Sequence, residues 1–224
     1  MKKHKYNKIF EEYKDKHLGG KAVLFGSGPT SKLYEPIDGV DIHVGCNFIG
    51  DLDIFDQKKE DHLLLDYYFF GDRDRSMSES FKVRGAKFGA CEVDGSPHPL
   101  HYSESEVESF GAFPMAVKNS MPPTFSLDIS VNPTCGMSVI FHALNFLFYT
   151  GVSKIYIVGC DCNKGRRCFD GREIINSGDT GTYEIYTVGW HYAKNFIKQN
   201  KLDTEIISVN PVGLRGLFQE YEKN

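Results

Sequence analysis

Short apolar runs with the length of β-strands recur along the chain, and polar or glycine-containing turns separate them. Several of these runs lack the apolar–polar alternation of a strand that faces water on one side. Uninterrupted apolar strands are typical of parallel sheets that are covered on both faces, and helical spacing in the intervening segments is the pattern of an α/β fold. We therefore predict a Rossmann-like, mainly parallel sheet with helices on both faces. Its strands are expected at 22–26, 41–47, 63–70, 154–161 and 205–209.

Three segments between these runs are expected to be helical. Residues 5–17 carry apolar side chains at the i, i+3, i+4, i+7 spacing of an amphipathic helix, beginning at Tyr6. Residues 139–149 are apolar almost all round, so we expect a helix buried in the middle of the domain. A third helix is expected near 183–200, before the last strand.

The middle of the chain, residues 72–133, has a different composition. It is rich in Ser, Pro, Glu and His, and its prolines interrupt any long element. We expect an irregular insertion that forms a lid or a loose connection. The length of 224 residues fits one large domain, so residues 1–224 are expected to form a single Rossmann-like domain that contains this segment.

Composition and charge narrow the classes of partner. An apolar content of 41% with 25% charged residues is ordinary for a soluble globular protein. The net charge of −4 gives no reason to expect a general polyanion-binding surface, so no nucleic-acid partner is expected. The first residues do not resemble a signal peptide, and the longest apolar run is too short for a transmembrane segment. We expect a cytoplasmic protein, and the sequence leaves a homo-oligomer open.

The first strand runs into a glycine turn, Gly26-Ser27-Gly28-Pro29-Thr30. A strand, a glycine turn and a proline that opens a helix are how a Rossmann-like domain aims backbone N–H groups at a phosphate. The turn lacks the third glycine of a dinucleotide fingerprint, so a dinucleotide site is disfavoured, and it lacks the Gly-Lys-Ser/Thr of a P-loop, so a P-loop is excluded. The motif predicts a nucleotide cradle of another kind, with an ordinary strand-to-helix connection as the alternative.

Other small polar groups stand at strand ends and at a helix start. Asn47 follows the second strand, Asp161 ends the strand near 154–161, and Thr134-Cys135-Gly136 precedes the buried helix. In an open parallel sheet, ligands collect at the carboxyl ends of the strands. Each residue also has a structural alternative, since Asn47 suits a turn and Asp161 suits a cap.

The cysteines do not predict a metal site. Cys160 and Cys162 are separated by one residue at a strand end, and Cys168 follows, but no paired Cys/His knuckle comes after them. We expect reduced thiols and no bound metal.

Together the strand-G-x-G-P-S/T turn at 26–30, Asn47, the T-x-G helix start at 134–136 and the strand-G-x-D ending at 159–161 resemble a known family. They occur in the same order in bacterial sialyltransferases of the Campylobacter type and in the related proteins that include archaeal pterin pyrophosphokinase-like proteins. The resemblance covers roughly 22–47 and 130–218 and leaves the middle segment unmatched.

In those sialyltransferases, the glycine turn and the asparagine hold a CMP-sugar donor, the helix start contacts the nucleotide, and no metal is needed. The resemblance therefore implies a nucleotide-sugar as co-substrate and no further cofactor. A CMP leaving group carries one phosphate, which N–H donors at helix starts can stabilise without Mg²⁺. The implied donor-site residues are Gly26, Ser27, Gly28, Thr30, Asn47, Thr134, Cys135, Gly136 and Asp161.

The family also uses a histidine base and two tyrosines that hold the departing phosphate. Here the corresponding tyrosines are Tyr183 and Tyr186, and the histidine within reach, His191, stands a few residues later than in the family. A neutral imidazole is suited to taking an acceptor hydroxyl proton near pH 7. The alternative for these three residues is packing in the core or on the surface of a helix.

The sequence therefore favours a metal-independent glycosyltransferase. Its donor is expected to be CMP-sialic acid or a related CMP-nonulosonate, and its acceptor a glycan in polysaccharide biosynthesis, with direct displacement and inversion. Two alternatives stay open. One is a Mg²⁺-dependent pyrophosphokinase acting on a pterin-like substrate, for which Asp72, Asp74 and Asp161 offer carboxylates. The other is a nucleotide-binding protein without catalysis.

Overall fold

The computed structural model describes the larger part of the chain, and its helices and strands lie in that part. The described residues are 7–56, 59, 61–71, 82–92, 102–117, 122–132, 134, 136, 138–162, 168–171 and 182–222. The strands are β1 (Lys21–Phe25), β2 (Ile42–Cys46), β3 (Tyr67–Phe70), β4 (Lys87–Glu92), β5 (Phe113–Val117), β6 (Lys154–Val158), β7 (Glu205–Ser208) and β8 (Gln219–Glu220). The α-helices are α1 (Glu104–Ser109), α2 (Val139–Tyr149) and α3 (Thr182–Asn200); the 3-10 helices are η1 (Asn7–Tyr13), η2 (Pro29–Leu33), η3 (Asn47–Asp51) and η4 (Asp53–Phe55).

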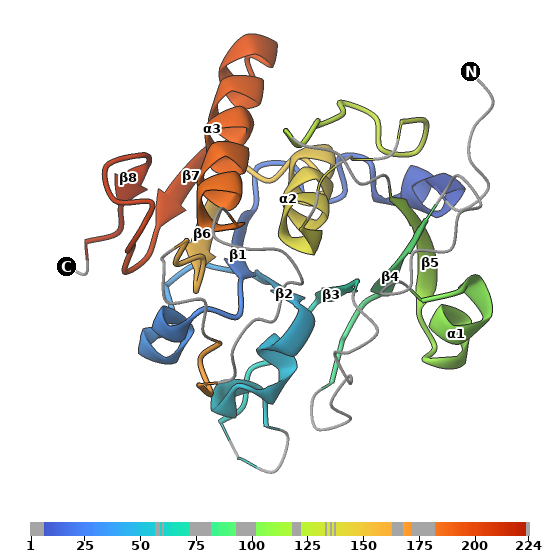
Figure 1. Ribbon diagram of the computed structural model, residues 1–224, viewed down its shortest axis with the longest axis horizontal. Coiled ribbons are helices and arrows are strands. Elements are labelled where there is room, and N and C mark those ends of the chain that lie inside the picture. Colours follow the sequence, from blue (N-terminus) through green and yellow to red (C-terminus); the bar gives the residue numbers. More distant parts are fainter. Residues whose placement is uncertain are drawn as a thin grey trace.

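The described strands form one parallel sheet in the order β5-β4-β3-β2-β1-β6-β7-β8. From β1 the chain adds strands outward to β5, and it then returns to add β6 on the other side of β1. The neighbours β1 and β6 therefore mark the point where the strand order reverses. Helices α2 and α3 cover one face of the sheet and α1 covers the other (Figure 1). The predicted Rossmann-like α/β fold is confirmed.

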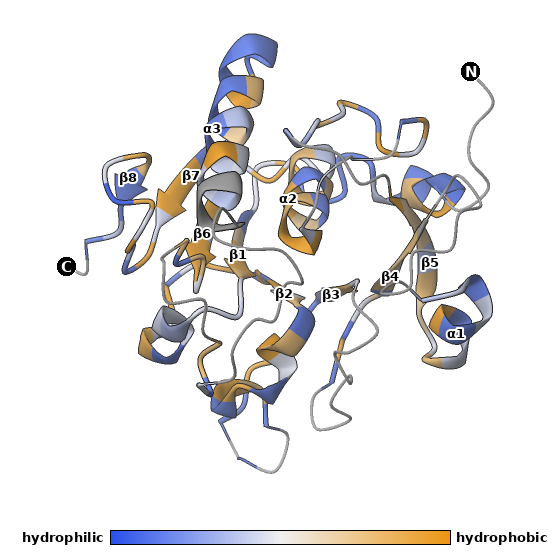
Figure 2. Ribbon diagram, viewed as in Figure 1, coloured by the Kyte–Doolittle hydropathy of each residue, from blue (hydrophilic) through white to orange (hydrophobic). Residues whose placement is uncertain are grey.

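Each face of the sheet has its own hydrophobic core, because successive strand residues point to opposite sides. In β1, Ala22 and Leu24 belong to the cluster with α2 and α3, whereas Val23 and Phe25 pack with η3, η4 and α1. All four side chains are fully buried. This is the physical reason why the strand has no alternation, and Figure 2 shows the strands of the sheet in the colour of hydrophobic residues.

The N-terminal helix differs in type from the expected amphipathic α-helix. It is the 3-10 helix η1, and its buried residues are Asn7, Phe10 and Tyr13. That spacing of three matches the three residues per turn of a 3-10 helix, which places i and i+3 on one face. Over so short a stretch, the apolar spacing fits both helix types.

The middle segment also differs from the expected irregular insertion, since β4, α1 and β5 all lie within 72–133 and extend the sheet. Proline is tolerated there because Pro114 lies on β5, the outermost strand, where one side of the backbone needs no ladder partner. Helix α1 begins with a capping box between Ser103 and Glu106. The remainder expected to form a lid, including Asp72 and Asp74, lies largely outside the described residues.

Across the ranges described above, no helix is both long enough and apolar enough to cross a membrane.

Candidate functional site

The candidate site is the carboxyl edge of the sheet at the junction of β1 and β6. Two loops meet there. The Gly26 N–H donates to the Val158 carbonyl, and the Gly28 N–H donates to the Gly159 carbonyl, both at 2.8 Å. A Cβ added to Gly26 would lie 2.7 Å from the Gly159 oxygen. The glycines of the turn are thus required by the close approach of two backbones.

Asp161 closes this junction. Its Oδ1 accepts a hydrogen bond from the Thr30 hydroxyl at 2.6 Å, and its Oδ2 accepts one from the Thr30 N–H at 3.0 Å. Asp161 is 5% exposed, and burial raises the pKa of its carboxyl group, while the two hydrogen bonds from Thr30 oppose that increase. Asp161 therefore holds the turn after β1 against the end of β6.

This arrangement differs from the expected phosphate cradle. The N–H groups of Gly26, Gly28 and Thr30 are already bonded to the β6 end, and the Ser31 N–H donates to the Gly28 carbonyl at 3.1 Å. The physical reason is that the carboxylate of Asp161 supplies the anion that the beginning of η2 would otherwise attract. A donor phosphate must find other partners at this edge.

Asn47 lies at the end of β2, the strand beside β1. Its φ of 51° is left-handed, a conformation that asparagine tolerates better than most residues. Its Oδ1 accepts from the Gly71 N–H at 3.3 Å, and its carbonyl accepts from the Tyr68 hydroxyl. Among the described residues, no partner is recorded for the Nδ2 group of this half-buried side chain. Asn47 therefore joins the ends of β2 and β3 and retains a donor for a ligand.

The residues before α2 are buried. Thr134 is 5% exposed, and its hydroxyl donates to Asn145 Oδ1 at 3.0 Å. Gly136 is packed so closely that an added Cβ would lie 3.3 Å from Pro123 Cβ. Both residues thus contribute to packing in this structure, and neither is exposed at the edge where Asn47 lies. Cys135 lies outside the described residues.

The expected catalytic residues lie on α3. His191 is exposed on the helix surface, immediately after Trp190, which is buried against Phe141. Tyr186 is half-buried and packs against the core of that face. Tyr183 lies in the first turn of α3, and its side chain is outside the described residues. The structure thus gives His191 access to solvent and brings Tyr186 against the core.

Two polar features of this edge were not predicted. The Phe169 N–H donates to the Ser27 carbonyl at 2.9 Å, so residues 168–171 lie beside the glycine turn. The Ser208 hydroxyl, at the end of β7, is buried and has no partner among the described residues. It lines a cavity of about 10 Å³ together with Thr30 and Asp161, which is room for one water molecule. In the sequence, Ser208 follows the apolar pair Ile206-Ile207 at the end of the last predicted strand, and this position indicated a polar group at the carboxyl edge.

Two of the thiols near this edge, those of Cys160 and Cys162, are largely removed from solvent. Burial raises the pKa of Cys160 well above its ordinary value, and it raises the pKa of Cys162 to about 12. Both thiols are therefore protonated near neutral pH in this structure. Within the described ranges, no group of three or more His, Cys, Asp or Glu side chains is placed to hold a metal ion.

Comparisons of the chain with protein-family models, with curated proteins and with solved structures found no match. The class that the fold defines is a Rossmann-like α/β protein. Its neighbouring strands β2, β1 and β6 all run into polar residues at one edge of the sheet.

Proposed function

We propose that the chain is a metal-independent glycosyltransferase that uses CMP-sialic acid or a related CMP-nonulosonate as donor and a glycan as acceptor. The observation that supports this most is the position of the 26–30 turn, Asn47 and Asp161 at the ends of three adjacent strands. Strands in a sheet lie about 4.8 Å apart, so the outer two of these ends are about 10 Å apart. That span suits a nucleoside monophosphate, and the location is where α/β proteins bind ligands.

In this proposal, Asn47 and Asp161 hold the nucleoside. Asn47 Nδ2 donates to an acceptor atom of the base or sugar. Asp161 keeps the turn closed through Thr30, and a lone pair of its carboxylate that Thr30 does not use accepts from a ribose hydroxyl. Because both carboxylate oxygens already bind Thr30, a role for Asp161 as a Mg²⁺ ligand is less favourable than this one. The pyrophosphokinase alternative is therefore the weaker of the two enzyme proposals.

The chemical step is assigned to groups of α3. The hydroxyls of Tyr183 and Tyr186 would donate to the departing phosphate and stabilise its developing charge. His191 would take the proton of the acceptor hydroxyl as that oxygen attacks the anomeric carbon and the bond from that carbon to the phosphate oxygen breaks. The products are the inverted glycoside and CMP.

The donor site is tested by thermal unfolding with CMP, UDP, GDP or ATP, each with and without Mg²⁺. We expect CMP to raise the melting temperature most and to do so without metal, because CMP is the leaving group of the proposed donor. At 100 times its Kd, a ligand that binds only the folded state stabilises it by about 2.7 kcal/mol. Asn47→Gly should abolish the CMP response, since glycine accepts the left-handed backbone and only the side chain is lost.

Lys201→Gly is the matched control, because Lys201 also has a positive φ, of 51°, but follows α3 and is exposed. It should keep the full response to CMP. A response confined to ATP with Mg²⁺ would favour the pyrophosphokinase, and no response to any of the four nucleotides would end the proposal.

The base is tested by hydrolysis of CMP-sialic acid. His191→Ala is expected to lower turnover by about 10²- to 10⁴-fold, the usual contribution of a general base, and to leave stabilisation by CMP unchanged. Asn195→Ala, one turn later on α3 and also exposed, should retain wild-type turnover. If His191→Ala turns over donor as fast as the wild type, His191 has no part in the chemistry.

A further inference from the structure

A second cavity lies at the opposite, amino-terminal edge of the sheet, where β1 to β4 begin. Its volume is about 460 Å³, within the usual range of roughly 300–1,000 Å³ for small-molecule sites. The segment after η1 and the starts of β2, β3 and β4 contribute its walls. The polar residues that line it are Lys16, His17, Asp41, Asp66, Tyr67 and Arg84.

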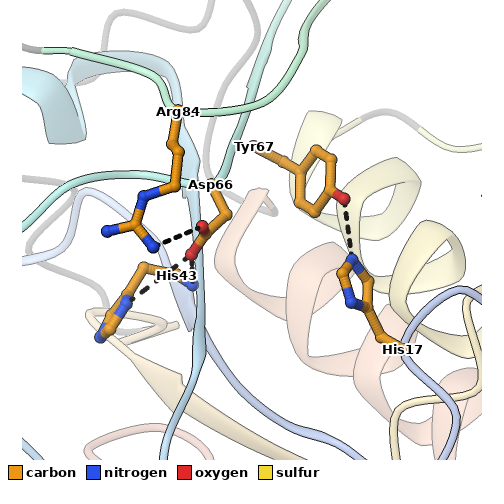
Figure 3. Close-up of polar contacts among 5 residues, drawn as sticks. All are labelled: His17, His43, Asp66, Tyr67 and Arg84. Atoms are coloured by element: carbon orange, nitrogen blue, oxygen red, sulfur yellow. Dashed lines mark hydrogen bonds and ion pairs between the residues drawn. The ribbon is translucent and has the colours of Figure 1, made fainter.

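One wall carries a neutral hydrogen-bonded pair. His17 Nε2 and the Tyr67 hydroxyl are 2.8 Å apart (Figure 3). Burial lowers the pKa of His17 and raises the pKa of Tyr67 to about 12. The pair is therefore uncharged near neutral pH, and it offers hydrogen-bonding groups next to the cavity without adding charge.

The second wall is built around Asp66, whose oxygens are already in use. Oδ2 accepts from the His43 N–H at 2.8 Å, and Oδ1 lies 3.5 Å from Arg84 Nη1 (Figure 3). Gly85 allows this loop to approach, because an added Cβ would lie 2.4 Å from the Asp66 carbonyl oxygen. The carboxylate is thus compensated by its own neighbours and orients the guanidinium of Arg84.

Two cationic side chains, those of Lys16 and Arg84, line the cavity together with the carboxylates of Asp41 and Asp66. The Arg84 side chain is 63% exposed and leaves most of its five N–H donors available. Lys16 Nζ lies 4.6 Å from the centre of the Tyr13 ring, and no carboxylate of the described residues is within ion-pair distance of it. The side chain of Asp41 is exposed, as are those of Lys16 and Arg84. An anion that enters between Lys16 and Arg84 meets two cations, and one of the two carboxylates that line the cavity, Asp66, is already compensated by its neighbours.

We infer that this cavity binds a small molecule through an oxyanion, a carboxylate or a phosphate, held by Arg84 and Lys16. His17 and Tyr67 bond a neighbouring oxygen of the same ligand. A guanidinium matches the geometry of both oxyanions, so the shared chemistry is what the site recognises. The cavity lies at the amino-terminal edge of the sheet, and the residues proposed to bind CMP lie at the carboxyl edge. The inference therefore does not depend on that function.

The test is a titration of the full chain with inorganic phosphate and, separately, with succinate, at an ionic strength held constant with NaCl. Chemical-shift changes of backbone amides report binding. We expect saturable binding of at least one probe, with shifts near Lys16 and Arg84. Arg84→Gln and Lys16→Gln should each weaken it about tenfold or more, as loss of a hydrogen bond between charged groups does.

Arg215→Gln and Lys32→Gln are the matched controls, since both side chains are exposed and lie outside the cavity. They should leave the affinity unchanged. Binding of phosphate alone identifies a phosphorylated ligand, and binding of succinate alone identifies a carboxylate. If neither probe shifts the amides beyond the NaCl reference, or if Arg84→Gln binds as tightly as the wild type, the inference is wrong. The response to CMP should be the same in Arg84→Gln as in the wild type, so this result and the donor-site result are independent.

Discussion

Gly159→Ala is expected to lower the free energy of unfolding by about 2–5 kcal/mol. Gly159 has a φ of 65°, a left-handed conformation that costs a residue with a Cβ about 1–2 kcal/mol. The added methyl would also lie 2.3 Å from the Gly26 carbonyl oxygen and 2.8 Å from Ser31 Cβ. The Gly26 oxygen is a backbone atom of the adjoining turn and cannot move aside alone. The steric clash therefore costs about 1–3 kcal/mol beyond the cost of the backbone conformation.

Gly111→Ala separates the two contributions. Gly111 has nearly the same φ, 64°, but nothing lies within 4 Å of its added Cβ. Gly111→Ala should lower the free energy of unfolding only by the cost of the left-handed backbone, about 1–2 kcal/mol. Urea unfolding of both variants measures the difference. Equal losses would show that the loops after β1 and β6 are not in close contact, and the candidate site as described would be wrong.

Phe146→Ala is expected to cost about 3–5 kcal/mol, the usual loss for a large aromatic side chain in a core. Phe146 lies on α2, is fully buried and points into an aromatic cluster on the sheet. Its ring centre lies 4.8 Å from that of Tyr67, 5.4 Å from Phe69 and 5.5 Å from Phe88. Removing it leaves a cavity where β3 and β4 meet the helix. The midpoint of urea unfolding should fall, and the dependence of the unfolding free energy on urea should be unchanged.

Phe113→Ala is the control for this cluster. Phe113 is 42% exposed on the outermost strand β5, and its ring centre is 6.2 Å from that of Phe88. The loss of unfolding free energy should be smaller, about 1–2 kcal/mol, because a large part of the Phe113 side chain stays in water in the folded protein. If Phe146→Ala were no more damaging than Phe113→Ala, α2 would not be packed on the sheet as the structure has it.

Local patterns in the sequence were sufficient for the central part of the fold. The apolar runs at 22–26 and 41–47 became β1 and β2, and the run at 139–149 became α2, because strands and helices buried on both sides must be apolar throughout. The turn at 26–30 and Asp161 were predicted at the carboxyl edge for the same reason. Alternation of strands and helices determines on which edge a strand end lies.

Contacts between distant segments decided the rest. Asp161 accepts a hydrogen bond from the Thr30 N–H, and the Thr134 hydroxyl donates to Asn145. Residue type and spacing along the chain do not predict either contact. Strands β4 and β5 are stabilised as continuations of a sheet rather than by their own composition. The cavity at the amino edge joins residues near 16, 66 and 84 that share no motif. Sequence periodicity records which face of an element is buried, whereas only the packed chain determines which polar groups satisfy one another and which remain available to a ligand.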